Sequence, residues 1–412
     1  MLPGPPGLVG LLLRSRLVRA LSGGSLASAR AALTCALLAL FLAVPASAAA
    51  PLPESIRVQA AKIRWTPSLT RQLVLGMPKI ETHLHLDGAL SPALIKELAV
   101  AQNHAPLASK SVAQIKRLAV VDKPRANLAE VLAAFDAVYP LLKTADAVER
   151  LAYEVVASAH AQNIRHLEVR FAPALQATET FSSEAVLQAA LRGLERGRKQ
   201  FGVGSGVLIC LIRPYAFVSK EKNQEMLELA IRYAGKGVVG IDLAGNEAAA
   251  PLSDFAEFYA KAKAAGLKLT AHAGEVPGSK DLETALELGV DRLGHATMLA
   301  QDEALMARVA ARGIPVEVNL TSNLRTGAIK AYTEHPIRAF QKAGLLVTPS
   351  TDDPGVFGID LNFEYLALAR RLSYKPEQLL ELSYQGIDAL FLPEAEKQAL
   401  RLRFESEFGA LL

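Results

Sequence analysis

The stretch Glu81-Thr82-His83-Leu84-His85-Leu86-Asp87-Gly88 ends an apolar run and decides how the chain is interpreted. In a β-strand successive side chains point to opposite faces, so His83 and His85 would point the same way. Two imidazoles on one face can share a metal ion, because histidine is the commonest metal ligand among side chains. Histidines two residues apart also occur as ordinary polar surface, so the rest of the chain has to decide between the two interpretations.

Eight short β-rich runs follow one another along the chain, and helical patterns separate most of them. The runs are residues 79–86, 164–171, 206–213, 238–243, 267–273, 291–295, 314–320 and 345–351. Amphipathic stretches such as 253–265 and 281–288 lie between them. Strands alternating with helices eight times predict a (β/α)8 TIM-type barrel of the α/β class. No glycine-rich motif for binding a dinucleotide or a phosphate follows the first run. The sequence therefore does not support a dinucleotide-binding or a P-loop protein.

The connection after the first run, residues 88–163, is long and holds several helical patterns, including one at 127–139. A structured insertion at this place usually covers the active mouth, so we expect a helical insertion after strand 1. Residues 376–412 are expected to form helices that close the bottom or side of the barrel. Without internal repeats or linkers, residues 77–412 are predicted to be one barrel domain, preceded by an extension at 49–76.

The pattern of residues 1–48 is typical of a signal peptide. They contain four arginines and no acidic residue, and 31–44 is almost wholly apolar. Pro45-Ala46-Ser47-Ala48 follows as a cleavage pattern of small residues. An uncleaved membrane anchor is the alternative, because the apolar stretch approaches the ~20 residues that a span needs. The proline and the small residues favour cleavage, with export to the periplasm or the medium and no stable membrane association afterwards.

Removal of the leader changes the charge balance. The whole chain has 45 Lys and Arg against 41 Asp and Glu, and loss of the four leader arginines leaves 41 of each. No global basic field is then present to attract nucleic acid. Cys210 is the one cysteine outside the leader and lies in an apolar run, which favours a buried core position. Glu168 and Arg170 share one face of the second run and are expected to form an internal ion pair.

More residues of metal-ligand type fall at the carboxyl ends of later runs. His272 and His295 end the fifth and sixth runs, and Asp352 and Asp353 end the eighth. In a barrel these strand ends converge on one mouth, where active sites lie. The remaining histidines are expected to be structural or at the surface: His104, His160, His166 and His335.

Three histidines and an aspartate form a suitable shell for one Zn²⁺ that keeps a position for water. Such an ion lowers the pKa of bound water towards ~7. Glu275 follows His272 by three residues, which places a carboxyl group beside the metal, where it can protonate an atom that gains charge as water adds. A two-metal hydrolase usually needs a bridging carboxylate or modified lysine after strand four. That run ends Ile241-Asp242-Leu243-Ala244-Gly245, with no lysine, so one metal is favoured.

Together these segments resemble the adenosine deaminase family of metal-dependent hydrolases. The resemblance rests on Thr82–Gly88, Asp242–Glu247, His272-Ala273-Gly274-Glu275, Gly294-His295 and Thr351-Asp352-Asp353-Pro354, and it covers about residues 77–395 in the right order. It implies a zinc-containing, amidohydrolase-like (β/α)8 barrel. The segment Thr321-Ser322-Asn323-Leu324 is more similar to adenosine than to adenine deaminases.

The resemblance also implies a role for each motif residue. One zinc ion per chain would be bound by His83, His85, His272 and Asp352. Glu275 would donate a proton to purine N1 as water adds at C6, and His295 would orient and stabilise the attacking group. Asp353 would contact N7, and the backbone N–H of Gly245 would meet N3. Asp87 would hold the ribose 5′-hydroxyl, and His85 would also lie against the substrate.

The expected function is therefore zinc-dependent hydrolytic deamination of adenosine, and of 2′-deoxyadenosine, to inosine and ammonia. Deamination of adenine or another 6-substituted purine is the alternative activity. A catalytically inert, secreted nucleoside-binding protein on the same fold is a third interpretation, and the intact metal shell with Glu275 argues against it. The expected partner is a small purine nucleoside and not a nucleic acid, and the oligomeric state stays open.

Overall fold

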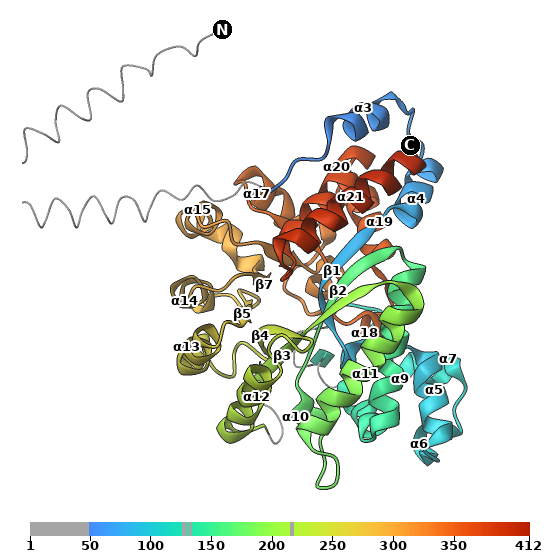
Figure 1. Ribbon diagram of the computed structural model, residues 1–412, viewed down its shortest axis with the longest axis vertical. Coiled ribbons are helices and arrows are strands. Elements are labelled where there is room, and N and C mark those ends of the chain that lie inside the picture. The colour runs from blue at the N-terminus through green and yellow to red at the C-terminus, as the bar shows by residue number, and fades with distance from the viewer. Residues whose placement is uncertain (1–48, 126–129, 132–133, 215–217) are drawn as a thin grey trace, which may run out of the picture. The chain divides into compact units, whose positions relative to one another are not determined.

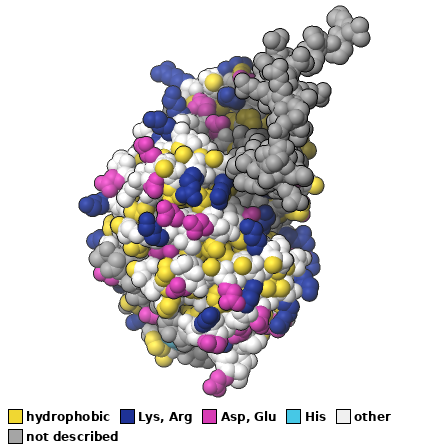
Figure 2. All heavy atoms as spheres, turned by 90° about the vertical axis from the view of Figure 1, so that its left-hand side faces the viewer, with side chains coloured by type: hydrophobic (Ala, Val, Ile, Leu, Met, Phe, Trp, Pro, Cys, Tyr) yellow, Lys and Arg dark blue, Asp and Glu magenta, His cyan; other side chains and the backbone are white. Residues whose placement is uncertain are grey.

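A computed structural model describes residues 49–125, 130–131, 134–214 and 218–412, with strands at the centre and helices around them (Figure 1). The expected leader at 1–48 lies outside the described residues, as does part of the helix expected at 127–139. Within the described ranges, none of the helices is both long enough and apolar enough for a membrane span. On the face drawn in Figure 2, basic and acidic side chains are interspersed rather than segregated.

Parallel strands form the barrel wall, and their ranges agree with the predicted runs to within a few residues. They are β1 (Lys79–His85), β2 (Ile164–Phe171), β3 (Gly204–Ile212), β4 (Val238–Ala244), β5 (Lys268–Leu269), β6 (His272–Ala273), β7 (Leu293–His295), β8 (Val316–Val318) and β9 (Val347–Pro349). β5 and β6 are two parts of one expected strand, interrupted at Thr270 and Ala271. The nine assigned strands therefore correspond to the eight predicted runs.

The strands pair as two parallel sheets, β1-β2-β3-β4-β5 and β6-β7-β8-β9, and backbone hydrogen bonds join these sheets into a barrel. At one junction, Thr270 N donates to Ile241 O at 3.0 Å. At the other, Asp352 N donates to His83 O at 2.8 Å and His85 N donates to Asp352 O at 2.8 Å, which pairs β1 with the chain just after β9. The predicted (β/α)8 barrel is confirmed.

The strands are apolar because both of their faces are buried, as is usual in parallel sheets. Residues Val207 to Leu211 in β3 show this, since none of the five is more than 1% exposed. Cys210 belongs to this buried run, as predicted.

The outer helices follow the strands in sequence. They are α9 (Ala145–Ala161), α11 (Ser183–Phe201), α12 (Lys220–Arg232), α13 (Ala256–Ala264), α14 (Asp281–Leu288), α15 (Glu303–Ala311), α17 (Ile337–Lys342) and α19 (Leu361–Arg371). The ends of α11 show why such segments start and stop. The Ser182 hydroxyl accepts from Ala185 N at 3.2 Å, and Gly202 ends the helix with a φ of +68°. A hydroxyl N-cap and a left-handed glycine are the favoured terminators.

The helical insertion after the first strand is confirmed. It contains η1 (Asp87–Ala89), α5 (Pro92–Ala101), α6 (Ala105–Ala108), α7 (Val112–Ala119), η2 (Phe135–Ala137) and η3 (Tyr139–Leu142). Short elements also follow other strands. They are α10 (Pro173–Gln176), η4 (Leu252–Phe255), η5 (Thr297–Gln301), α16 (Leu320–Arg325), η6 (Tyr332–Glu334) and α18 (Pro354–Phe357).

Both ends of the described chain pack at the end of the barrel where β1 begins. The elements there are α3 (Glu54–Lys62), α4 (Pro67–Gly76), α20 (Pro376–Gln385), η7 (Gly386–Ala389) and α21 (Glu394–Leu411). Ala50 N donates to Asp388 Oδ2 at 2.8 Å, and Ser383 Oγ donates to Pro78 O at 2.5 Å. These contacts leave the opposite end of the barrel, where β1 ends at His85, for the site.

Candidate active site and metal centre

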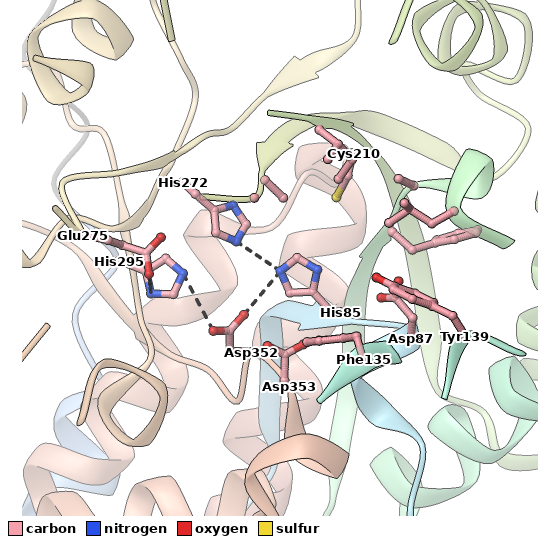
Figure 3. Close-up of a pocket in the computed structure, with 16 residues that line it drawn as sticks. His85, Asp87, Phe135, Tyr139, Cys210, His272, Glu275, His295, Asp352 and Asp353 are labelled. Atoms are coloured by element: carbon pink, nitrogen blue, oxygen red, sulfur yellow. Dashed lines mark hydrogen bonds and ion pairs between the residues drawn. The ribbon is translucent and has the colours of Figure 1, made fainter. Parts of the chain in front are cut away.

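Three histidines and one aspartate from three strand ends approach one another at the mouth of the barrel. His83 and His85 lie at the end of β1, His272 lies in β6 and Asp352 follows β9. Figure 3 shows His85, His272 and Asp352 of this set, with His295 beside them. His83 Nε2 lies 3.2 Å from His272 Nε2 and 3.1 Å from Asp352 Oδ1. His85 Nε2 lies 3.1 Å from His272 Nε2 and 3.3 Å from Asp352 Oδ1. In a tetrahedral zinc site with bonds of about 2.0–2.1 Å, donor atoms are about 3.3 Å apart. The four measured separations therefore suit ligands of one such ion.

His295 lies next to the same centre. Donor atoms of His83, His272, His295 and Asp352 are all within 4.8 Å of one another, so His295 is also near enough to be considered as a ligand. Its Nε2 is 3.9 Å from Asp352 Oδ2, however, which is farther than the nitrogens of His83 and His85 are from Asp352 Oδ1. These distances favour His85 over His295 as the fourth ligand.

Buried carboxylates face the outer nitrogens of two of the histidines. His83 Nδ1 lies 2.6 Å from Glu317 Oε2, and His272 Nδ1 lies 3.0 Å from Asp242 Oδ2. A proton held at Nδ1 leaves the Nε2 lone pair available to a metal, and such carboxylate–histidine pairs are common behind zinc ligands. The donor set therefore fits a divalent cation of the zinc type.

Two buried arginines hold these carboxylates in the ionised form. Arg170 donates to Asp242 Oδ2 at 2.9 Å and to Glu317 Oε2 at 2.9 Å, and Arg292 donates to Glu317 Oε1 at 2.6 Å. Burial by itself raises the pKa of Glu317, but the two guanidinium groups hold that pKa well below its usual range. Since removal of one partner would leave a buried charge unpaired, the network acts as a unit.

The expected ion pair between Glu168 and Arg170 is wrong. Glu168 instead accepts from Arg292 Nη1 at 2.5 Å and from Phe391 N at 2.6 Å. Inward-facing residues two apart on one strand occupy successive layers of a barrel, so each pairs across its own layer. Glu317 and Arg292 were not singled out from the sequence, although a charged residue inside an apolar buried strand, as in Val316–Val318, is a signal for such a role.

The loop that carries Glu275 is shaped by the carboxylate of Glu247. One oxygen of Glu247 accepts from Gly274 N at 2.8 Å and from Ser279 Oγ at 2.6 Å. The other accepts from Glu275 N at 2.8 Å and from Val276 N at 2.9 Å. Four donors on one buried carboxylate leave the loop little freedom, so Glu247 sets where Glu275 points.

Glu275 itself is buried beside the centre. Its Oε1 is 3.6 Å from His295 Nδ1, and its Oε2 has no hydrogen-bond partner among the described residues. Burial, together with the negative charges of Glu247 and Asp352, raises the pKa of Glu275 to about 8 against an opposing effect of His272. A carboxyl group that keeps its proton near neutral pH can act as a general acid.

Glu247→Gln is expected to lower kcat about 10²-fold, because small displacements of a catalytic group can cost that much. The amide would turn an N–H₂ group towards two of the four donors and so release the loop. Zinc content should stay at the wild-type value, since no ligand is replaced. Steady-state kinetics with metal analysis test this, and Glu287→Gln, on the exposed side of α14, is the matched control. Unchanged kcat in Glu247→Gln would contradict the role of Glu247.

Several residues at the centre adopt a strained backbone. His295, Ala296 and Asp352 have φ values of +60°, +51° and +62°. Residues other than glycine rarely adopt this region, and such strain concentrates at functional sites. Hydrogen bonds hold the conformation, since Asp352 is bound to β1 on both sides of its peptide unit and Ala296 N donates to Ala273 O at 3.0 Å.

A pocket extends from the metal centre. In Figure 3, Glu275 and His295 lie on one side of it, and Asp87 and Tyr139 lie on the opposite side. Apolar side chains also line it: Phe135, Phe171, Leu175 and Ile212. A mostly apolar pocket with a few polar groups at its two ends suits a small organic ligand.

Asp87 faces the pocket from η1 and not from the strand. β1 ends at His85, and Leu86 already has helical dihedrals, φ −62° and ψ −47°. Asp87 therefore does not lie on the strand that carries His85, although both residues line the pocket. Gln176 Nε2 donates to Asp87 Oδ2 at 3.0 Å, and burial raises the pKa of Asp87 to about 6.

Asp353 and Gly245 also line the pocket. Asp353 Oδ1 is buried and has no hydrogen-bond partner among the described residues. It lies so close to Gly88 that a Cβ there would be 1.8 Å from Oδ1, so only glycine fits. Burial, followed by the charge of Asp352, raises the pKa of Asp353 well above its usual range. Gly245 has a φ of +95°, a conformation that glycine adopts readily.

The sequence matches the family model described as adenosine deaminase over residues 78–406. The chain belongs to the adenosine deaminase family. An adenosine deaminase of Lacticaseibacillus casei strain BL23 is 34% identical over 338 residues, which cover 82% of this chain and 98% of that relative. One from Shewanella loihica is 33% identical over 328 residues, covering 79% and 97%.

Solved structures of this family superpose on the barrel. The N6-mAMP deaminase of Arabidopsis has a TM-score of 0.73 at 29% identity, covering 81% of this chain and 99% of its own. A cog1816 amidohydrolase of Burkholderia ambifaria, solved with bound Zn, has a TM-score of 0.74 at 27% identity, covering 89% and 98%. An adenine deaminase of Arthrobacter aurescens has a TM-score of 0.72 at 25% identity, covering 81% and 99%. The chain is thus a hydrolase of the group that deaminates adenosine-like purines.

Within the adenosine deaminase barrel, every residue that the sequence indicated for the site lies at the centre or along the pocket. Of the four histidines expected to be structural or at the surface, His335 is structural and is also connected to the site. It is buried, and its Nε2 lies 3.1 Å from Asn323 Oδ1. Asn323 Nδ2 in turn lies 2.9 Å from His295 Nδ1. No spacing in the sequence indicates this connection, because it depends on how α16 and the start of α17 pack.

Proposed function

We propose that the protein deaminates adenosine, and also 2′-deoxyadenosine, to inosine and ammonia with one zinc ion per chain. The observation that carries the proposal is the position of the buried carboxyl group of Glu275 beside the histidine–aspartate cluster, at one side of a pocket that Asp87 lines at the other. Membership of the adenosine deaminase family supports the same reaction. Export by the leader is part of the proposal.

Four side chains would hold the zinc ion: His83, His85, His272 and Asp352. Their donor atoms have the separations of a tetrahedral set, and two of the imidazoles are oriented by carboxylates. A bound Zn²⁺ supplies a nucleophile by lowering the pKa of a water molecule towards ~7. With four protein donors in place, the ion would take the water molecule as a fifth ligand, because zinc can expand to five-coordination.

Each of the remaining polar groups then contacts a different part of the substrate. Glu275 holds a proton and gives it to purine N1 as C6 becomes tetrahedral. His295 faces the reacting side from its strained turn. Asp353 stays protonated because its pKa is raised by burial, so it can donate to N7, which only accepts. The Gly245 N–H meets N3 at the opposite edge of the base, and Asp87 holds the 5′-hydroxyl of the ribose.

A nucleoside suits this pocket better than a nucleotide. None of the described residues lining the pocket is a lysine or an arginine, and its far side carries the carboxyl group of Asp87. Phosphate recognition normally uses cationic side chains or helix N-termini, and an anionic carboxylate repels phosphate. The Arabidopsis relative is named for a nucleotide substrate. The residues that line this pocket should therefore differ between a deaminase of nucleosides and a deaminase of nucleotides.

Asp87→Ala is expected to lower kcat/KM for adenosine roughly 10- to 150-fold, because a hydrogen bond to a charged group contributes about 1.5–3 kcal/mol. Turnover of free adenine should stay low and unchanged, since adenine has no ribose to bind. Paired assays with both substrates measure the difference. Asp122→Ala, at an exposed aspartate outside the pocket, is the control. An equal loss for adenine and adenosine would show that Asp87 does not recognise the ribose.

A substrate panel tests the proposed function as a whole. Initial rates are measured from the purine absorbance change with adenosine, 2′-deoxyadenosine, adenine, AMP and N6-methyl-AMP. The expected order places the two nucleosides first, and Glu275→Gln protein prepared in parallel controls for contaminating deaminase. Preference for AMP or adenine would overturn the nucleoside assignment. Binding of adenosine without any turnover by zinc-loaded protein would instead support the inert binding protein.

Processing of the leader should give a mature chain that begins near Ala49, because cleavage is expected after Ala48. Intact-mass spectrometry of protein exported by an expressing bacterium measures the new N-terminus. Ala48→Leu, which places a large residue at the cleavage position, should slow processing. A full-length product retained in the membrane would support the anchor instead.

A further inference from the structure

A line of buried hydrogen bonds runs from the start of α17 to the metal centre. Ile337 N donates to His335 Nδ1 at 3.1 Å. His335 Nε2 lies 3.1 Å from Asn323 Oδ1, and Asn323 Nδ2 lies 2.9 Å from His295 Nδ1. His295 then turns its Nε2 towards Asp352 Oδ2, which is 3.9 Å away. The side chains of His335 and Asn323 thus connect a backbone amide to His295 beside the metal centre.

The first member of this line has a fixed direction, because a backbone N–H can only donate. His335 Nδ1 must therefore accept. Burial lowers the pKa of His335 to about 3, so its ring is neutral near pH 7 and carries its single proton on Nε2. That proton is donated to Asn323 Oδ1, and the carboxamide must present its N–H₂ group to His295.

The same reasoning fixes the orientation of the Asn323 amide, which coordinates alone do not establish. If the amide were turned round, its N–H₂ group would face His335 Nε2. His335 would then need its proton on Nδ1, directly against the N–H of Ile337. Two donors would face each other at 3.1 Å inside the protein. Burial of such an unpaired donor pair is costly, so the orientation with Oδ1 towards His335 is preferred.

Other groups near His295 do not compete with this line. Asn319 Nδ2 lies 3.3 Å and 3.4 Å from the two ring nitrogens, so it does not distinguish between them. Glu275 Oε1 is 3.6 Å from His295 Nδ1, beyond the range of a good hydrogen bond. The contact of 2.9 Å from Asn323 is the shortest to either ring nitrogen among these groups.

We propose that His335, through Asn323, fixes the tautomer of His295, so that Nδ1 accepts and the Nε2–H faces the metal centre. His335 is then a positioning residue for the reaction. Asn323 accepts a hydrogen bond from His335 and donates one to His295, and so carries the order of donors and acceptors from one ring to the other. His295 acts at the centre as a hydrogen-bond donor that stabilises negative charge, and its Nε2 is not free to remove a proton. The activity readout below rests on the proposed function, but the tautomer readout does not.

The tautomers can be measured directly. Long-range ¹H–¹⁵N correlation spectra of protein labelled with ¹⁵N in its histidine rings distinguish protonated from unprotonated ring nitrogens. Spectra of the zinc-loaded and the zinc-free protein should show Nε2–H in both His295 and His335. Signals are assigned by their loss in single variants. A proton on Nδ1 of His295 in the zinc-loaded wild-type protein would overturn the proposal, whatever the substrate proves to be.

Asn323→Asp is the variant that should reverse the tautomer. The carboxylate is nearly isosteric but only accepts, so it takes the Nε2–H of His335 and draws the His295 proton to Nδ1. Zinc content should be unchanged, and kcat should fall about 10²-fold, the loss typical when one preorganised donor is removed. Persistence of Nε2–H on His295 in folded Asn323→Asp would overturn the proposal.

A second pair of variants keeps the proposal testable if Asn323→Asp fails to fold. His335→Gln retains a donor for Asn323 Oδ1 and an acceptor for Ile337 N, so it should keep the His295 tautomer and most of the activity. His335→Phe retains neither, so both His295 tautomers should be populated and kcat should fall roughly tenfold. His160→Gln, at an exposed position of α9, is the control. Equal behaviour of His335→Gln and His335→Phe would contradict a positioning role, because packing alone would then explain the losses.

Discussion

His83→Ala and Asp352→Ala proteins are expected to lack both zinc and deaminase activity. Each substitution removes a donor atom that lies 3.1–3.3 Å from its neighbours in the ligand set. Loss of a partner behind a ligand typically costs 10–100-fold in metal affinity, and loss of the ligand itself should cost more. Glu317→Gln therefore provides a graded comparison, since it leaves His83 in place but weakens its orientation.

Metal analysis of purified protein and zinc titration of the chelated protein measure these effects. His104→Ala, outside the pocket, should bind one zinc ion like the wild type. His295→Ala should also keep zinc while it loses activity, and this separates His295 from the ligand His85. A His295→Ala protein without zinc, beside a His85→Ala protein with zinc, would reverse that assignment. Two zinc ions per wild-type chain would contradict the mononuclear site.

Glu275→Gln is expected to keep zinc and fold but to lose roughly 10²–10⁴-fold in kcat, the usual contribution of a general acid or base. The amide occupies nearly the same volume and cannot deliver a proton to N1. Because Glu275 N is held by Glu247, the replaced side chain should stay in position. Single-turnover and steady-state rates of the zinc-loaded variant are the measurement, with Glu287→Gln as the control. Near-normal kcat would remove Glu275 from the mechanism.

The same substitution should affect stability with a defined pH dependence. The pKa of Glu275 is raised from an ordinary value of 4.5 to about 8 in the folded, metal-free protein. The folded state therefore binds more protons than the unfolded state between these values, and its free energy of unfolding falls as the pH rises through that window. Glutamine removes this effect. The metal-free variant should be more stable than the wild type above pH 8, with the gain fading towards pH 4.5.

Local patterns were sufficient to predict the barrel, and they pointed to residues that meet at its mouth. All eight runs became wall strands, because parallel strands buried on both faces are apolar throughout and end at polar positions. His272 and Asp352 stood out because a ligand type followed such a run. The expected pairing of Glu168 with Arg170 failed because it considered one strand alone, whereas inward side chains pair across the barrel. The path from His335 to His295 likewise depends on contacts between segments, which spacing along the chain does not contain.

The position of Asp352 links the metal centre to the closure of the barrel. The backbone of Asp352 bonds to β1 on both sides, and its carboxylate lies against the two histidines of the same strand. β1 and the segment just after β9 thus meet at the ligand set, although Leu84 and its bridge partner Asp352 are 268 positions apart in the sequence. Closing so long a loop carries a large entropic cost. A cation bound by residues of both strands would offset that cost. The cofactor would therefore also stabilise the closure of the barrel.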